Sequence, residues 1–377
     1  MILTTCAACA APLAHNAPRC VRCHTRYCNQ TCQHDHWRRG HKQMCKKIHR
    51  GGNAEQYHAD KKYKEAVAEA VEKCADDTKG QTCFICTQAL HWKTKEGLVR
   101  GCSCRGTAGF AHVSCLAEQA KILVAEAEEN NWDNDRFMPR WNRWHTCSLC
   151  KQQYHGVVRR ALGWASWKTY LGRPETSWPR MCSLSLLGNG LAGADLYEEA
   201  LSVQEAELSV LRRLGEAEYN ILVAQGNLAN TYQELGRLEE ALPLRRDVYS
   251  GWVKIEGEEH RETLREANNY ASLLKRLKHF GEAKSLLRKT TRVALRSLGE
   301  DHDTTFKSRW IYARVLCEDP AATLDDLRES VTTLEEIEPI ARRVLGGAHP
   351  TALSIEATLR IVRGMLQCLR DAVERSG

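Results

Sequence analysis

The chain has 377 residues, enough for two or three domains, and its 43% hydrophobic and 27% charged residues are ordinary for a globular protein. It contains no run of about 18 apolar residues and no basic, apolar leader, so we expect neither a membrane span nor a signal peptide. The net charge of +7 is uneven, since residues 1–160 carry 25 Lys and Arg against 15 Asp and Glu. A basic, cysteine-rich region of this kind suits contact with nucleic acid or acidic proteins, but because no basic stripe alternates with aromatic residues, we favour a solvated surface over a nucleic-acid partner.

Residues 1–48 hold eight potential metal ligands in four close pairs. The pairs are Cys6 with Cys9, Cys20 with Cys23, Cys28 with Cys32, and His41 with Cys45. Zinc takes four sulfur or nitrogen ligands in a tetrahedron, and such pairs reach one ion from a tight turn. We assign His41 rather than His36, because the His-x3-Cys spacing puts His41 and Cys45 on one face of a short helix. A module this small needs the metal to supply folding free energy.

This module resembles the MYND zinc finger over its whole length, including Tyr27 before Cys28 and the run Cys32-Gln33-x3-Trp37-x3-His41. The resemblance implies two interleaved zinc ions. Cys6, Cys9, Cys28 and Cys32 would hold one, and Cys20, Cys23, His41 and Cys45 the other. It also implies docking of short proline-containing peptides in a groove lined by Gln33 and Trp37. Alternatively, Trp37 only packs in the small core of the finger.

A charged helical linker is expected over residues 49–80, where Lys and Glu mix with Val67, Ala70 and Val71 at helical spacing. Residues 81–156 then hold a second set of eight ligands. Its pairs are Cys83 with Cys86, Cys102 with Cys104, His112 with Cys115, and Cys147 with Cys150. Only four of the 18 cysteines remain outside the two sets. This pattern disfavours a disulfide framework and favours a reducing compartment, cytoplasmic or nuclear.

The second set resembles the RING-CH finger, with its central Cys102-Ser-Cys104-Arg-Gly step and the x7 gap before His112. A PHD finger shares the ligand order but usually spaces its second pair more widely. The resemblance implies that Cys83, Cys86, His112 and Cys115 hold one zinc and Cys102, Cys104, Cys147 and Cys150 another, which makes four Zn²⁺ ions in the chain. It implies no catalytic side chain.

By the same resemblance, Ile85 and Lys151 occupy positions that contact a ubiquitin-conjugating enzyme. The alternatives are a minor core contact for Ile85 and a solvated lysine. The sequence departs from the family at Gln119, where Trp is common, at Ser148 and Leu149, where proline is often found, and in the long 31-residue gap between Cys115 and Cys147. These departures bear on ligase activity and leave zinc binding untouched. We expect a helix over Leu116–Glu129 within that gap, followed by a loop.

Residues 157–377 are predicted to form a helical repeat domain. Gly215, Gly257, Gly299 and Gly346 mark a period of 42, 42 and 47 residues, with two helical patterns in each period. One unit pairs Tyr219–Leu235 with Leu238–Ile255, and the next pairs Glu262–Leu277 with Phe280–Leu298. We place the five extra residues of the third unit near Pro320, which breaks a helix. Residues 155–171 are expected to form a helical cap.

The repeats resemble the tetratricopeptide repeats of kinesin light chains, carried by Gly236-Arg-Leu-Glu-Glu-Ala-Leu-Pro-Leu and Leu345-Gly-Gly-Ala-His-Pro. We expect about three full units, with a divergent unit over 172–214 before them and a half unit after them. Such solenoids present a concave groove to peptides. Asn227 and Asn269 recur one period apart and are candidates for binding a peptide backbone. Packing between helices or solvent exposure is the alternative for both.

The predicted fold is therefore mainly α, with two small cross-brace zinc-finger modules followed by an α-α solenoid. Two functions remain open. One is a RING-CH-type E3 ubiquitin-protein ligase, a transferase whose MYND and repeat domains bind substrate or partner proteins. The other is a non-enzymatic zinc-binding adaptor for protein-protein interaction. A MYND-linked methyltransferase is disfavoured, because no cofactor-binding domain fits between the fingers and the repeats. The sequence names neither the substrate, the conjugating enzyme, the MYND ligand nor the oligomeric state.

Overall fold

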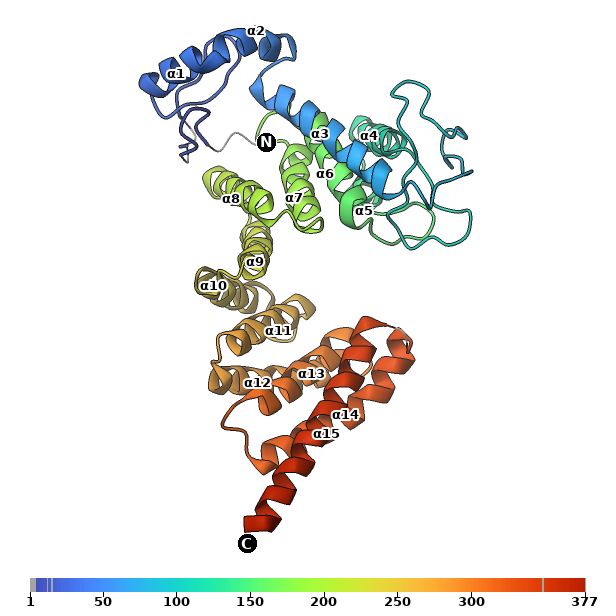
Figure 1. The fold of residues 1–377 in the computed structure, drawn as a ribbon, viewed down its shortest axis with the longest axis vertical. Helices are drawn as coiled ribbons and strands as arrows, with labels where there is room; N and C mark the ends of the chain where they lie inside the picture. Colours follow the sequence, from blue (N-terminus) through green and yellow to red (C-terminus); the bar gives the residue numbers. More distant parts are fainter. Residues whose placement is uncertain (1–4, 12, 15, 348, 377) are drawn as a thin grey trace. The chain divides into compact units, whose positions relative to one another are not determined.

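The structure is a computed structural model that describes residues 5–11, 13–14, 16–347 and 349–376. Its regular elements are almost all α-helices, joined in the ligand-bearing regions by loops with three isolated β-bridges between described residues, Arg19 with Arg26, Val99 with Ala111 and Thr146 with Gln153. The chain divides into two compact units, residues 1–215 and 216–377 (Figure 1). The mainly α fold with a helical solenoid is thus confirmed.

The first module is built on a helical segment that runs from Gln30 to Arg50. It comprises α1 (Gln30–His36), a π-helical turn, η1 (Trp37–His41), and α2 (Lys42–Arg50). Asn29 caps α1 by accepting a hydrogen bond from the N–H of Cys32. Gly40 lies at φ 119° and kinks the segment just before His41. The kink allows Tyr27, His41, Cys45 and Ile48 to be buried in one small core.

The predicted linker contains α3 (Ala54–Lys73), which packs along α6 (Gly156–Tyr170) rather than standing free (Figure 1). Ala59, Ala66, Val67 and Ala70 form its buried stripe. Arg160 pairs with Glu69 at 2.7 Å, and Lys168 pairs with Asp60 at 3.1 Å. A helix expected as a spacer therefore belongs to the core of the first unit.

The long gap in the second ligand set is folded. It contains α4 (Val113–Glu129), as expected, and then α5 (Asn134–Trp141) and the short 3₁₀ turn η2 (Asn142–Trp144), where we expected only a loop. Asp133 caps α5, and buried Trp141 and Trp144 pack with Tyr170 of α6. The sequence around Pro139 hid this helix, because a helix with an internal proline forms only when tertiary packing stabilises it.

Two further helices complete the first unit: α7 (Trp178–Ala192) and α8 (Tyr197–Leu214). The predicted cap, α6, lies close against α7 because both helices carry glycine where they meet. A Cβ added at Gly163 would lie 3.0 Å from the Cα of Leu187, and one added at Gly190 would lie 3.1 Å from the Cα of Arg160. Trp164, Trp167 and Tyr170 are all buried, so α6 is a core helix.

Glu207 on α8 is buried against α7 and makes the first unit sensitive to pH. Burial raises the pKa of Glu207 to about 7, although Ser185 donates a hydrogen bond to one carboxylate oxygen. The folded state holds this proton more tightly than the unfolded state, so stability falls as pH rises from about 4.5 through 7. The stability advantage of Glu207→Gln over wild type, measured by urea unfolding, should therefore grow by about 1 kcal/mol from pH 6 to pH 8. Glu198→Gln, exposed on the same helix, should show no such gain; an equal gain in both variants would contradict the assignment to Glu207.

The second unit consists of antiparallel helix pairs and a final helix (Figure 1). The helices are α9 (Glu218–Glu234) with α10 (Leu238–Glu256), α11 (Arg261–Arg276) with α12 (Phe280–Leu298), α13 (Asp303–Glu318) with α14 (Leu324–Leu345), and α15 (Pro350–Ser376). The four predicted helices of the first two pairs are confirmed to within a residue at each end. Each helix packs on the next, and first helices also meet, since α11 contacts α13 and α13 contacts α15.

The five extra residues of the third pair are shared between two places. The loop between α13 and α14 is two residues longer than its counterparts, as expected near Pro320, and α14 is three residues longer than α12. Thr323 and Asp326 form a capping box that starts α14. The proline thus accounts for only part of the insertion. Among the described residues, no helix has the length and apolar character needed to cross a membrane.

Candidate metal centres

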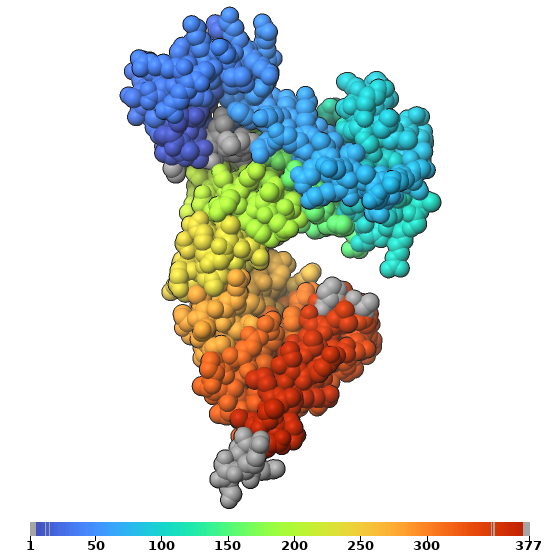
Figure 2. Space-filling model, in the orientation of Figure 1, coloured from blue at the N-terminus to red at the C-terminus, as the bar shows by residue number. Residues whose placement is uncertain are grey.

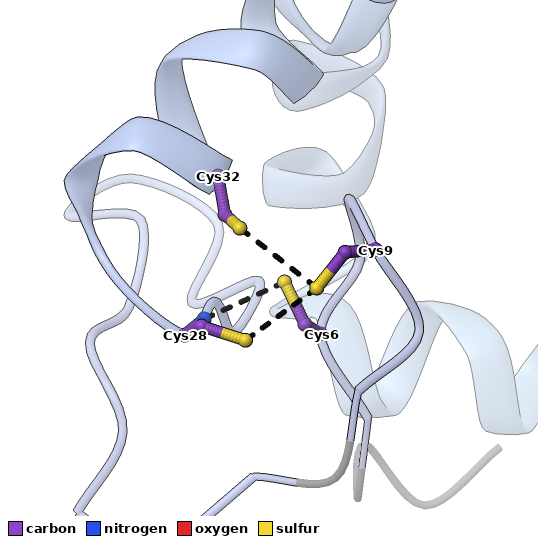
Figure 3. A group of neighbouring side chains, drawn as sticks. All are labelled: Cys6, Cys9, Cys28 and Cys32. Atoms are coloured by element: carbon purple, nitrogen blue, oxygen red, sulfur yellow. Dashed lines mark hydrogen bonds between the residues drawn. The ribbon is translucent and has the colours of Figure 1, made fainter.

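Sixteen cysteine and histidine side chains converge in four groups within the described part of the chain. In each group the four ligand atoms lie within 4.8 Å of one another. The groups are Cys6, Cys9, Cys28 and Cys32; Cys20, Cys23, His41 and Cys45; Cys83, Cys86, His112 and Cys115; and Cys102, Cys104, Cys147 and Cys150. Ligand pairs alternate between the two groups of each module, as the two resemblances implied. Figure 3 shows the first group, whose four sulfur atoms point toward one another.

The separations within the groups fit zinc. A tetrahedral zinc ion with Zn–S bonds of about 2.3 Å holds its sulfurs about 3.8 Å apart and a nitrogen–sulfur pair slightly closer. Cys9 Sγ lies 3.5 Å from Cys28 Sγ and 3.8 Å from Cys32 Sγ (Figure 3). Cys104 Sγ lies 3.8 Å from Cys147 Sγ. The distance from Cys23 Sγ to His41 Nε2 is 3.3 Å, and that from Cys86 Sγ to His112 Nδ1 is also 3.3 Å.

The protonation chemistry of the donors also fits a cation. Burial raises the pKa of Cys6, but the backbone N–H groups of Ala8, Cys9 and Cys28 outweigh burial and lower it to about 6. Hydrogen bonding with Cys9 and burial raise the pKa of Cys28, in the same group, to about 12. Four adjacent thiols thus do not all ionise by themselves, because four neighbouring thiolates repel one another. A divalent cation among them offsets this repulsion.

All four Cys-x2-Cys pairs are presented by the same turn. The residue after the second cysteine has a left-handed backbone in each case: Ala10, His24, Thr87 and Lys151, with φ between 60° and 61°. Its N–H donates to the carbonyl of the first cysteine, at 2.9, 2.9, 2.8 and 3.1 Å respectively. This turn aims both sulfurs to one side. Because L-residues rarely adopt this conformation, its fourfold repetition indicates a shared structural requirement.

The rings of His112 and His41 are each oriented by contacts to residues outside the ligand groups. His112 Nε2 donates to the carbonyl of Ala89 at 3.3 Å, which leaves Nδ1 free to bind a metal. His41 presents Nε2 to Cys23 and stacks on His36, with ring centroids 4.7 Å apart. His36 itself bonds to the hydroxyl of Tyr27 at 3.0 Å. His36 therefore supports His41 and lies outside the ligand group.

Gly109 closes the fourth group and has no room for a side chain. A Cβ there would lie 2.6 Å from the Cβ of Cys104 and 3.2 Å from the Sγ of Cys102, and its φ is +85°. Gly106 also has a positive φ, +60°, but faces open space. Both Gly109→Ala and Gly106→Ala place alanine at a positive φ, but only Gly109→Ala displaces ligands. We therefore expect Gly109→Ala to lose zinc at a chelator concentration at least about tenfold lower than the concentration that Gly106→Ala requires. Equal zinc retention in the two variants would mean that Gly109 does not shape the group.

The predicted partner contacts differ in exposure: Lys151 and Trp37 are exposed, whereas Gln33 and Ile85 are half-buried and Ile85 also packs against the core of the first unit. Ile85 is half-buried and its N–H faces Cys83 Sγ at 3.4 Å, whereas Lys151 is exposed and its amine donates to the carbonyl of Ser148 at 2.6 Å. Gln33 and Trp37 lie one helical turn apart on the α1–η1 segment. Trp37 is 40% exposed and touches the ring of His41 edge-on, so it is not a buried core residue.

Asn227 on α9 and Asn269 on α11 are both half-buried. The neighbouring Asn268, which we did not single out, is instead buried and joins α11 to α13 by bonding Ser308 Oγ at 2.6 Å and the carbonyl of Thr304 at 3.1 Å. The buried Arg245–Glu266 pair was also not expected. A charged residue at a core position of the helical pattern was the available signal in that case.

Two families of known proteins match the second set of ligands and the helical repeats. A RING-variant domain model matches residues 83–150, and a tetratricopeptide repeat model matches residues 179–252 and 220–296. Neither of these two matches extends into the first module, and no curated protein matches the chain.

Several solved structures resemble part of the chain. One is a putative kinesin light chain from Podosopora anserina with nearly identical TPR-like repeats. It is 22% identical, with a TM-score of 0.43, over 54% of this chain and 94% of that one. Another is BtubC from P. vanneervenii, 12% identical with a TM-score of 0.38, over 70% of this chain and 91% of that one. A likeness at this level carries no argument about activity or partners.

Proposed function

Because the chain carries a RING-variant domain and tetratricopeptide repeats, we propose that it is an E3 ubiquitin-protein ligase of RING-CH type. The observation that supports this most is the convergence of the eight ligands of residues 83–150 into two zinc-compatible groups. In such a finger the zinc ions are structural, and each closes its loops with four protein ligands. The finger would act by holding a ubiquitin-loaded conjugating enzyme in a reactive pose, which restricts conformations without a nucleophile.

The unusual features of the finger are compatible with this function. The long gap forms α4, α5 and η2, and α5 packs away onto α6 through Trp141 and Tyr170 at a ring-centroid distance of 5.7 Å. The insertion therefore has its own packing partner. Where the family commonly has an exposed tryptophan, α4 carries Gln119, and one turn later Ile122 is 57% exposed. Ile85, Ile122 and Leu149 supply apolar contact area for an enzyme.

Lys151 fits the role of a cation shared between the enzyme and ubiquitin. The left-handed backbone of the zinc turn fixes its position, and among the residues that the structure describes its amine bonds only to a carbonyl of its own turn. Exchanging that neutral acceptor for a carboxylate of the complex would strengthen the hydrogen bond. Lys151 would therefore strengthen binding of the ubiquitin-loaded conjugating enzyme and leave binding of the free enzyme unchanged.

The other modules would select the protein to be modified. The first module fits a MYND finger with two zinc ions, in which the partly exposed Trp37 and the adjacent Gln33 receive a peptide. In the second unit, Asn227 and Asn269 lie on first helices in equivalent positions, 42 residues apart, and their half-buried amides are suited to the backbone of an extended peptide. Both sites bind peptides by conformation and hydrogen bonding, so neither requires a catalytic group.

Binding of conjugating enzymes by the full chain tests recruitment. We would titrate a panel of enzymes by calorimetry, both free and joined to ubiquitin through a stable amide. Ile85→Ala should weaken both forms about tenfold, as expected for loss of an apolar contact near the centre of an interface. Lys151→Gln should weaken only the ubiquitin-joined form. The control Leu353→Ala, an exposed apolar residue on α15, should change neither.

The second candidate function is an adaptor whose modules only bind proteins. The observation that favours it is Gln119, because an amide there offers less apolar area to an enzyme than the tryptophan common in the family. If no enzyme of the panel binds while wild-type protein holds its full zinc, the adaptor becomes the preferred function. Binding that Ile85→Ala leaves unchanged would argue against the proposed contact surface.

A further inference from the structure

The positive charge of the chain is concentrated on the first module. Residues 1–50 contain nine Lys and Arg but only one carboxylate, Asp35, so this module accounts for most of the excess charge of the first 160 residues. Asp35 lies 3.9 Å from Arg39. Seven other cations of the module are exposed and form no ion pair within the described part of the chain. They are Arg19, Arg22, Arg38, Lys42, Lys46, Lys47 and Arg50.

The helix arranges these cations in a row. On α2, Lys42, Lys46 and Arg50 follow one another at four-residue intervals, which places them on one face about 6 Å apart. The opposite face, through Cys45 and Ile48, is buried in the module. In Figure 1, α2 lies on the side of the first module away from α7 and α8, and the module forms a separate lobe of the first unit in Figure 2. The row is therefore open to a partner.

The absence of carboxylates identifies the kind of partner. Surfaces of proteins usually intersperse both signs of charge, and complementary protein interfaces do the same. The face of α2 carries one sign only, so it suits a partner whose anions follow one another without interruption. A nucleic-acid backbone is such a partner. Trp37 is 40% exposed just before α2, and its ring, which a peptide would cover in the proposed function, would alternatively stack on an unpaired base, which favours a single strand over a duplex.

We propose that the cationic face of α2 is a binding site for single-stranded nucleic acid, recognised through its phosphates. This departs from the sequence-based expectation, which averaged charge over 160 residues and looked for aromatic residues alternating with basic ones. The relevant pattern is instead a row spaced by one helical turn, whose aromatic neighbour lies beyond the kink at Gly40. Recognition through phosphates implies little sequence preference and strong dependence on salt.

The test uses the full chain and a fluorescein-labelled oligouridine of about 20 nucleotides, with binding followed by anisotropy from about 50 to 300 mM salt. We expect the triple variant Lys42→Gln, Lys46→Gln, Arg50→Gln to reduce the slope of log Kd against log salt by about 2 and to weaken binding at least about tenfold at 0.1 M salt. The matched control Arg261→Gln, Lys278→Gln, Arg292→Gln removes three exposed, unpaired cations of the second unit and should bind as wild type does.

Three results would overturn the proposal. Absence of binding would show that the face is only solvated. Equal weakening in both triple variants would show that net charge, and not this face, governs binding. A polyglutamate peptide that binds in a Lys42-, Lys46- and Arg50-dependent way, while oligouridine does not, would show that an acidic protein segment is the partner. Zinc content, measured on every variant, should equal that of wild type, because none of the substituted residues is a ligand.

Discussion

Replacing Arg245 with alanine is expected to destabilise the second unit by about 3–5 kcal/mol. The guanidinium is 1% exposed and binds three helices together. It donates to Glu266 Oε2 on α11 at 3.0 Å, to Gln233 Oε1 on α9 at 2.9 Å, and to Asn230. Without it, Glu266 would remain buried with only the more exposed Arg265 at 3.3 Å. The same network holds α9 and α11, which carry Asn227 and Asn269.

Urea unfolding of the full chain measures the effect, with Arg246→Ala as the control because Arg246 is the exposed neighbour of Arg245. The double variant Arg245→Met, Glu266→Leu should recover much of the lost stability, since a buried ion pair is costly to break but can often be replaced by apolar side chains. An Arg245→Ala variant no less stable than Arg246→Ala would mean that the pair contributes nothing to the packing of α9, α10 and α11.

Removing zinc is expected to have the largest effect on the molecule. Structural zinc sites contribute apparent free energies of about 10–16 kcal/mol at pH 7, so an excess of chelator should unfold both ligand-bearing modules. The helices α9–α15 contain none of the sixteen ligands and should stay folded. Three quantities are measured during chelation: the number of thiols that react with a disulfide reagent, the amount of zinc released, and the helix content by circular dichroism.

Fourteen of the 18 cysteines are proposed ligands, and they should become reactive in step with zinc release. Exposed Cys368 should react before any zinc is lost, and buried Cys317 on α13 should stay protected throughout, which makes these two cysteines internal controls. Adding zinc back under reducing conditions should restore protection. Ligand cysteines that remain unreactive after the metal has gone would show that the modules are held by their packing alone.

The sequence predicted the ligand pairs and the repeat helices because both depend on local spacing, whereas the grouping of the pairs was implied by the two resemblances. Pairs such as Cys83 and Cys86 form in one turn, and the 42-residue period of Gly215, Gly257 and Gly299 follows from helix pairs that contact mainly their neighbours. In this chain each of these glycines directly follows a helix of the repeats, with φ between 67° and 85°. A single residue in each case therefore carried enough information to place a helix end.

The features that could not be predicted depend on distant contacts. The role of α3 as a core helix requires α6, which begins more than 80 residues after Lys73 along the chain. The helix around Pro139 is stabilised by the packing of Trp141 against Tyr170. The pairing of Arg245 with Glu266 was equally invisible, since a sequence pattern shows that a charged residue is buried but not which partner neutralises it.

The most direct test of the central claim is discharge of ubiquitin from charged conjugating enzymes to free lysine, in the presence of the full chain with zinc bound. The proposed function predicts that at least one enzyme discharges at least about tenfold faster, that Ile85→Ala removes the acceleration at unchanged zinc content, and that Leu353→Ala preserves it. If zinc-loaded protein accelerates discharge from no enzyme of the panel, the chain is not a ubiquitin ligase.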